Sequence, residues 1–108
     1  MREGLLVIAS AILLVMAACT MADASSWKVE KLPGDYKFVE GPVWTPWGTL
    51  LFSDCPDNKI WEMTWSGEIV KRKVYRDPAG PSNGLTFDRQ GRLVVCDYGN
   101  HRVIRIDK

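Results

Sequence analysis

The chain has 108 residues, of which 46% are hydrophobic and 25% are charged, and its formal net charge is +1. This composition is that of one small globular domain and excludes a chain that is disordered by composition. A nearly neutral charge offers little electrostatic attraction to phosphates, and the one basic cluster, residues 71–76, has no aromatic stacking surface beside it. We therefore expect no nucleic-acid partner.

The first segment, residues 1–24, has the pattern of an export signal. Arg2 precedes an almost wholly apolar run, residues 4–18, which has the length of a signal peptide and is short for a membrane span. Cleavage after Ala24 would follow an Ala-Asp-Ala site, whereas a lipoprotein signal would end before Cys19 and leave that cysteine lipidated. An uncleaved anchor is a third interpretation. All three predict an exported protein, periplasmic or secreted, that meets the membrane only through the signal or a lipid anchor.

Short strands separated by turns are predicted along the rest of the chain, and no helical period appears after residue 26. Residues 25–39 are expected to form an N-terminal strand segment. Further strands are predicted in stretches that are apolar or alternate with polar residues, over residues 42–45, 50–54, 59–64 and 69–75. The turns between them contain Pro, Gly, Asn, Asp or Ser, which favour turns.

The sequence repeats with a period of 43 residues, because the segment that begins at Glu40 aligns without a gap with the segment that begins at Asn83. The identical pairs are Gly41 and Gly84, Gly48 and Gly91, Leu50 and Leu93, and Asp54 and Asp97. Four strands in a unit of about 40 to 50 residues are typical of a propeller blade. We therefore predict an all-β fold, a β-propeller, with blade 1 over residues 40–82 and a partial blade 2 over residues 83–108.

Propellers close with about four to eight blades, whereas this chain holds only about two four-stranded blades. Two blades leave an apolar face and a strand edge open to water. We therefore expect the chain to be a fragment, a truncated gene product or one part of a larger assembly. Residues 27–32 of the N-terminal segment would then supply one strand of the last blade and so close the ring.

Glu40 and Asn83 occupy equivalent positions, each before a glycine in the first strand of its blade. The first strand lies nearest the propeller axis, so equivalent positions on successive blades converge on the central channel. Carboxylate and amide oxygens that converge there would suit a hard cation such as Ca²⁺. The simpler alternatives are an exposed carboxylate at Glu40 and a turn residue at Asn83, since Asn-Gly is a common turn pair.

Two stretches resemble a known family. GPVWTPWGTLLFSDCPDNKIW, from Gly41, is similar to the first-blade stretch of the senescence-marker-protein/gluconolactonase family. PSNGLTFDRQGRLVVCDYGNHRV, from Pro81, resembles the second-blade stretch of its bacterial gluconolactonase branch. The resemblance covers residues 38–108 and implies a six-bladed propeller with a divalent metal, usually calcium, in the channel.

The resemblance assigns roles to two residues. The glutamate of the Glu-Gly-Pro motif is a metal ligand in the family, and this role carries over to Glu40. Asn83 faces the same channel and is carried over as a substrate contact or a neighbour of the ligands, because the family's Asn and Asp ligands come from later blades. The family's general base also belongs to a later blade, so no catalytic residue is assigned.

The function implied by the resemblance is that of a calcium-dependent, gluconolactonase-like lactone hydrolase whose partner is a small-molecule lactone or sugar acid. This chain holds one ligand and one neighbour, so we expect weak calcium binding and no activity from it alone, and whether it acts as an enzyme stays open. The alternative is a non-catalytic NHL-like propeller that binds protein or carbohydrate. Glu40 distinguishes the two, because such a binder needs no acidic residue there.

Five further residues are expected to be structural. Asp54 and Asp97 should anchor the turns that follow them. Cys55 stands where the family usually has isoleucine and, like Cys96, is expected to be a buried thiol rather than half of a disulfide. His101 lies in a turn that resembles an NHL repeat and is not expected to be a catalytic base.

Overall fold

The computed structural model describes residues 27–107. The expected export signal over residues 1–24, with the alternatives at Cys19, lies outside the described residues. Within residues 27–107 no helix is both long and apolar enough to cross a membrane.

The chain divides into two compact units, residues 1–31 and 32–108. In the described part of the first unit Lys28 pairs with Glu30, and no strand forms. The strand expected over residues 25–39 is absent from its described part up to residue 38, and regular pairing begins only at Val39. A strand is held by hydrogen bonds to a neighbouring strand, and none of the described strands pairs with residues 27–38.

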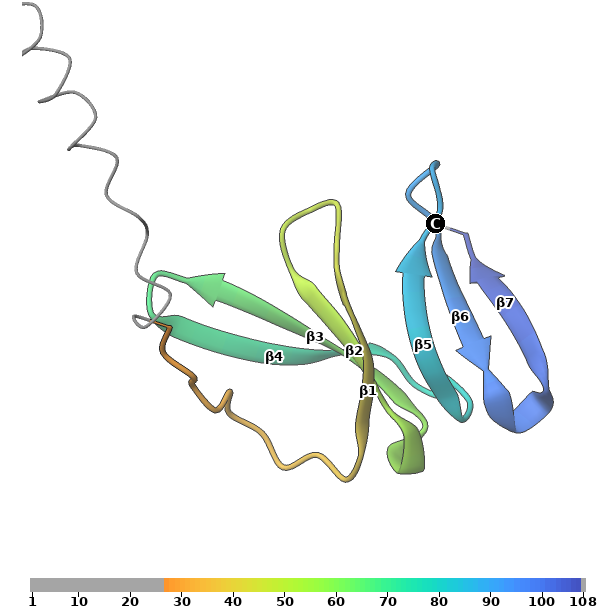
Figure 1. The fold of residues 1–108 in the computed structure, drawn as a ribbon, viewed down its shortest axis with the longest axis horizontal. Coiled ribbons are helices and arrows are strands. Elements are labelled where there is room, and N and C mark those ends of the chain that lie inside the picture. The colour runs from red at the N-terminus through yellow and green to blue at the C-terminus, as the bar shows by residue number, and fades with distance from the viewer. Residues whose placement is uncertain (1–26, 108) are drawn as a thin grey trace, which may run out of the picture. The chain divides into compact units, whose positions relative to one another are not determined.

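The second unit begins with an antiparallel sheet, here called sheet A, whose four strands follow one another in chain order (Figure 1). Its strands are β1 (Val39–Trp44), β2 (Leu50–Asp54), β3 (Lys59–Ser66) and β4 (Ile69–Arg76). The predicted strands are confirmed, with β2 at the predicted residues and β1 beginning earlier. The four-stranded antiparallel meander is the arrangement of a propeller blade.

Sheet B repeats the first three strands of sheet A (Figure 1). Its strands are β5 (Ser82–Phe87), β6 (Leu93–Asp97) and β7 (Arg102–Ile106), and each begins 43 residues after its counterpart in sheet A. The short 3₁₀ helices η2 (Cys55–Asp57) and η3 (Tyr98–Asn100) keep the same offset. Each ends at a non-glycine residue in the left-handed region, Asn58 and His101, both with φ of 53°. The repeat in the sequence is therefore a repeat in the structure.

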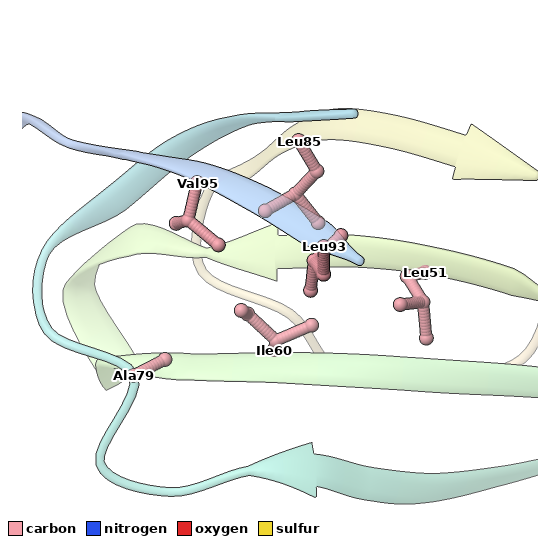
Figure 2. Close-up of a cluster of buried hydrophobic side chains, with 6 residues drawn as sticks. All are labelled: Leu51, Ile60, Ala79, Leu85, Leu93 and Val95. Carbon is pink, nitrogen blue, oxygen red and sulfur yellow. The ribbon is translucent and has the colours of Figure 1, made fainter. Parts of the chain in front are cut away.

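The core lies between the faces that the two sheets present to each other. Side chains alternate across a strand, so Leu51 of β2 and Ile60 of β3 share one face of sheet A, and both are 0% exposed. Leu93 and Val95 of β6 are 1% and 0% exposed on the facing side of sheet B. Figure 2 shows these four side chains with Leu85 and Ala79 as one cluster.

Burial differs between equivalent positions of the two sheets. Ile60 is fully buried beneath sheet B, whereas Val103, its counterpart one repeat later, is 67% exposed. The two residues have similar chemistry, so the difference follows from their surroundings: sheet B and Ala79 pack on Ile60 and β4 flanks it, whereas Val103 lies on β7, the edge strand of sheet B within the described residues.

We expect Ile60→Val to lower the free energy of unfolding by about 0.5–1.5 kcal/mol, because it removes a methylene from a filled core. Val103→Ala should change it by less than about 0.5 kcal/mol, since that side chain is exposed. Urea unfolding at low protein concentration measures both values. Equal losses from the two variants would contradict the packing of sheet B on sheet A.

Candidate functional site

A β-bulge marks the predicted site in each sheet. The pairing of β1 with β2 shifts register between Glu40 and Val43, and that of β5 with β6 shifts between Ser82 and Leu85. A bulge places an extra residue on one strand and re-aims the side chains beside it. Glu40 and Asn83 therefore lie at the bulges of their strands. The sequence repeat predicted that the two residues are equivalent, but it did not predict the bulges.

Gly41 brings the bulge of β1 against the backbone of β5. Its φ is 55°, and a Cβ atom built on it would lie 2.3 Å from the carbonyl oxygen of Asn83 and 2.7 Å from Cα of Gly84. No other residue fits such an approach, because any side chain would collide with the backbone of β5. The backbone of the Glu40-Gly41 bulge thus adjoins that of Asn83.

Buried hydroxyl groups join the two sheets beside this contact. Ser53 donates a hydrogen bond to the Asn83 carbonyl oxygen at 2.9 Å. Its Oγ lies 3.0 Å from Oγ of Ser82. Since the single Ser53 proton goes to the carbonyl, the Ser82 hydroxyl is the donor to Ser53. Both serines are 0% exposed, and we call this set of hydrogen bonds the serine seam.

Cys55 extends the serine seam. Its thiol is buried, as expected, and donates to the Ser82 carbonyl oxygen at 2.9 Å. Burial, and after it the nearby negative charges of Glu40 and Asp54, raises the pKa of the thiol. The thiol is therefore held in its protonated form, which is the form that can donate the hydrogen bond.

Glu40 lies at the open end of the serine seam. It is half-buried and pairs across the two strands with Ser53. None of the ion pairs or side-chain hydrogen bonds found in residues 27–107 involves its carboxylate, in contrast to the buried acids Asp54, Glu62 and Asp97.

The oxygen donors at this site suit a hard cation in type, but they are few. Calcium takes about six to eight oxygen ligands, whereas residues 27–107 contain no cluster of three or more His, Cys, Asp or Glu side chains that could hold a metal. Glu40, with Asn83 beside it, fits such an ion as part of a ligand set that needs further members.

Asp54 does not anchor the turn after it, contrary to expectation. Its carboxylate accepts hydrogen bonds from the backbone N–H groups of Lys37 at 3.2 Å and Phe38 at 3.0 Å. It therefore fixes the segment that leads into β1. The reason is that this segment passes beside the end of β2, where its free N–H groups need acceptors.

Asp97, the equivalent residue in sheet B, anchors its turn as expected. Its carboxylate accepts from Asn100 Nδ2 at 2.9 Å and from Arg102 Nε at 2.8 Å. The Arg102 hydrogen bond lowers the pKa of this carboxyl group. His101 completes the turn through its backbone N–H, which bonds to the Tyr98 carbonyl oxygen.

Cys96 is exposed, so the expectation of a second buried thiol was wrong. The side chains of Val95 and Asp97 occupy the covered face of β6, and alternation turns Cys96 to the other face. Cys55 and Cys96 are both free thiols, consistent with the expected lack of a disulfide between them.

The serines of the seam were not singled out from the sequence. The available signals were that Ser53 interrupts an otherwise apolar strand and that Ser82 directly precedes Asn83. Neither signal shows that the two hydroxyls meet, because their contact depends on how one sheet packs on the other.

Comparison with known proteins gives two similarities. Residues 11–108 match the family described as the SMP-30/Gluconolactonase/LRE-like region. A protein of Zymomonas mobilis subsp. mobilis named gluconolactonase is 30% identical over 95 residues, which cover 76% of this chain and 26% of the relative. The chain thus matches about a quarter of the relative's length.

Gly41→Ala should destabilise the fold in two ways. A left-handed alanine costs about 1–2 kcal/mol, and the forced separation of β1 from β5 should add about 1–3 kcal/mol. Gly48→Ala is the matched control, because Gly48 has a φ of 83° but a Cβ atom built on it would have no neighbour within 4 Å. Chemical unfolding of both variants measures the difference, and equal losses would show that the Gly41 contact is not formed.

Proposed function

The chain belongs to the SMP-30/gluconolactonase/LRE-like family, and from this membership we propose that it forms part of a calcium-dependent lactone hydrolase of the gluconolactonase type. Its relative in Zymomonas mobilis carries the name gluconolactonase. The substrate proposed for the complete enzyme is accordingly a small-molecule lactone or sugar acid. Export through residues 1–24 is part of the same proposal.

The observation that carries the proposal is the position of Glu40. A half-buried carboxylate usually gains a partner in the folded protein, yet none of the described side chains provides one. The bulge and the serine seam hold the backbone that bears this carboxylate. A fixed, unneutralised oxygen donor is what a cation site requires from its scaffold.

Asn83 is proposed to contact substrate. It is half-buried, and the Ser53 hydrogen bond fixes its backbone carbonyl, which leaves the side-chain amide to act independently. An amide both donates and accepts hydrogen bonds, so it can meet the hydroxyl and carbonyl groups of a lactone. The remaining cation ligands and the general base are proposed to come from outside the described residues, so this chain alone should be inactive and bind calcium weakly.

The test places this chain's residues 40–106 in the Zymomonas relative in exchange for the matching segment. We expect the chimera to hydrolyse gluconolactone and to lose activity with a chelator. Glu40→Gln should lower kcat/KM at least about 100-fold, because it removes the charge but keeps the shape of the side chain. Asn83→Ala should mainly raise KM.

Glu68→Gln is the matched control, since Glu68 is exposed in the turn between β3 and β4. It should leave the kinetics unchanged. An active chimera that tolerates Glu40→Gln and ignores the chelator would refute the metal role, whereas a folded but inactive chimera would favour a non-catalytic NHL-like binder. Micromolar calcium affinity of the 108-residue chain would refute the expectation that it cannot complete the site.

A further inference from the structure

Asp54 is a buried carboxylate at the end of β2, 1% exposed, and its side chain does not cap the turn that follows. It accepts hydrogen bonds from the backbone N–H groups of Lys37 and Phe38. The backbone N–H of Cys55 donates to the Phe38 carbonyl oxygen at 3.1 Å. Two adjacent residues, Asp54 and Cys55, therefore hold both hydrogen-bonding groups of the Phe38 backbone.

The equivalent carboxylate in sheet B is engaged differently. Asp97 is also 1% exposed, but it accepts from the side chains of Asn100 and Arg102 in the turn that follows it. The two sheets thus put one buried carboxylate to two uses. In sheet B it holds its own turn, and in sheet A it holds a segment that is distant in the sequence.

Two residues of the turn after β2 account for this difference. Asp57 and Lys59 stand at the positions from which sheet B engages its carboxylate. An ionised carboxylate such as Asp57 has no proton to donate, and Lys59 pairs with Asp77 at 3.9 Å. Asp57 instead accepts from the side chain of Lys37. The turn after β2 therefore holds the segment before β1 a second time.

The segment held in this way leads directly to Glu40. Residues 27–38 contain no strand, so β1 begins without regular pairing before it, and such an end frays readily. On the other side of Glu40 the pairing of β1 with β2 shifts at the bulge. The contact at Phe38, two residues before Glu40, therefore limits the movement of the Glu40 backbone where the regular sheet is short.

We propose that Asp54 is a positioning residue for Glu40. By holding the backbone of Lys37 and Phe38, it fixes the place at which the Glu40 carboxylate meets the cation. This inference rests on the proposed function, in which Glu40 is a cation ligand. A ligand that is already held in place raises the affinity for the ion, because less order has to be imposed on binding.

The test uses the chimera with the Zymomonas relative, with the exchanged segment extended to residues 36–106 so that it includes Lys37 and Phe38. Calorimetry after treatment with a chelator measures the affinity, with calcium alone as the probe. Asp54→Asn leaves one acceptor oxygen in place of two. It should weaken calcium binding about tenfold, as the loss of a group that orients a metal ligand does. KM for gluconolactone should not change, because Asn83 is held through Ser53 instead.

Asp97→Asn is the matched control, since its carboxylate is equally buried but holds its own turn. It should lower the thermal stability and leave the calcium affinity unchanged. Asp57→Asn is a second variant, at a side chain that is 25% exposed. It removes the pair with Lys37 and supplies a donor that can draw Asp54 toward the turn. It should also weaken calcium binding, and it tests the inference if Asp54→Asn does not fold.

A purely structural role would not make the effect of Asp54 depend on Glu40. If Asp54 acts through Glu40, Asp54→Asn should cause no further loss of affinity in a Glu40→Gln chimera, because residues that act together have non-additive effects. In the full 108-residue chain, amide hydrogen exchange at Lys37 and Phe38 should become faster in Asp54→Asn and not in Asp97→Asn.

An unchanged calcium affinity in Asp54→Asn, beside a loss in Glu40→Gln, would overturn this inference and leave the proposed function intact. Equal losses of affinity from Asp54→Asn and Asp97→Asn would also overturn it, since they would report general destabilisation. A parent chimera that binds no calcium, or a Glu40→Gln chimera that binds it as the parent does, would overturn the proposed metal role and this inference together.

Discussion

The arrangement of this molecule depends on the close approach of Gly41 to the backbone of β5. At that point there is no room for a side chain between the two strands, so the sheets can adjoin there only with glycine at this position of the β1 bulge. The approach in turn brings Ser53 and Ser82 within hydrogen-bond distance and buries them completely. One steric constraint thereby fixes where the two predicted site residues, Glu40 and Asn83, lie along their sheets.

The apolar core and the serine seam have different roles. Full burial of a Leu, Ile or Val side chain contributes about 1.5–3 kcal/mol, and the six-residue cluster between the sheets holds several such side chains. A buried hydrogen bond contributes about 1 kcal/mol net, but an unpaired buried hydroxyl costs about 1–3 kcal/mol. The core therefore drives the association of the sheets, whereas the seam disfavours arrangements in which the two serine hydroxyls lose their hydrogen-bond partners.

The sequence was sufficient to predict the strands of sheets A and B and their repeat, because a period of 43 residues and turn residues between apolar runs are local patterns. It wrongly predicted a further strand before Val39. It was not sufficient for contacts between segments that are distant in the sequence, or for which face of a strand is covered. Asp54 binds the segment before β1 rather than its own turn, and Cys96 faces outward although Cys55 is buried. Both outcomes depend on which parts of the chain pack against each other, and the sequence repeat alone does not predict this packing. The equivalence of Glu40 and Asn83 was predictable, whereas the seam that holds them was not.

The central claim is that the serine seam couples the two sheets at the predicted site, and a double-mutant cycle tests it most directly. Ser53→Ala, Ser82→Ala and the double variant would be compared by urea unfolding at low protein concentration. The account predicts a coupling energy between the two sites of about 0.5–3 kcal/mol, as is found for residues in contact. Effects that add to within about 0.3 kcal/mol, as those of distant residues do, would contradict it.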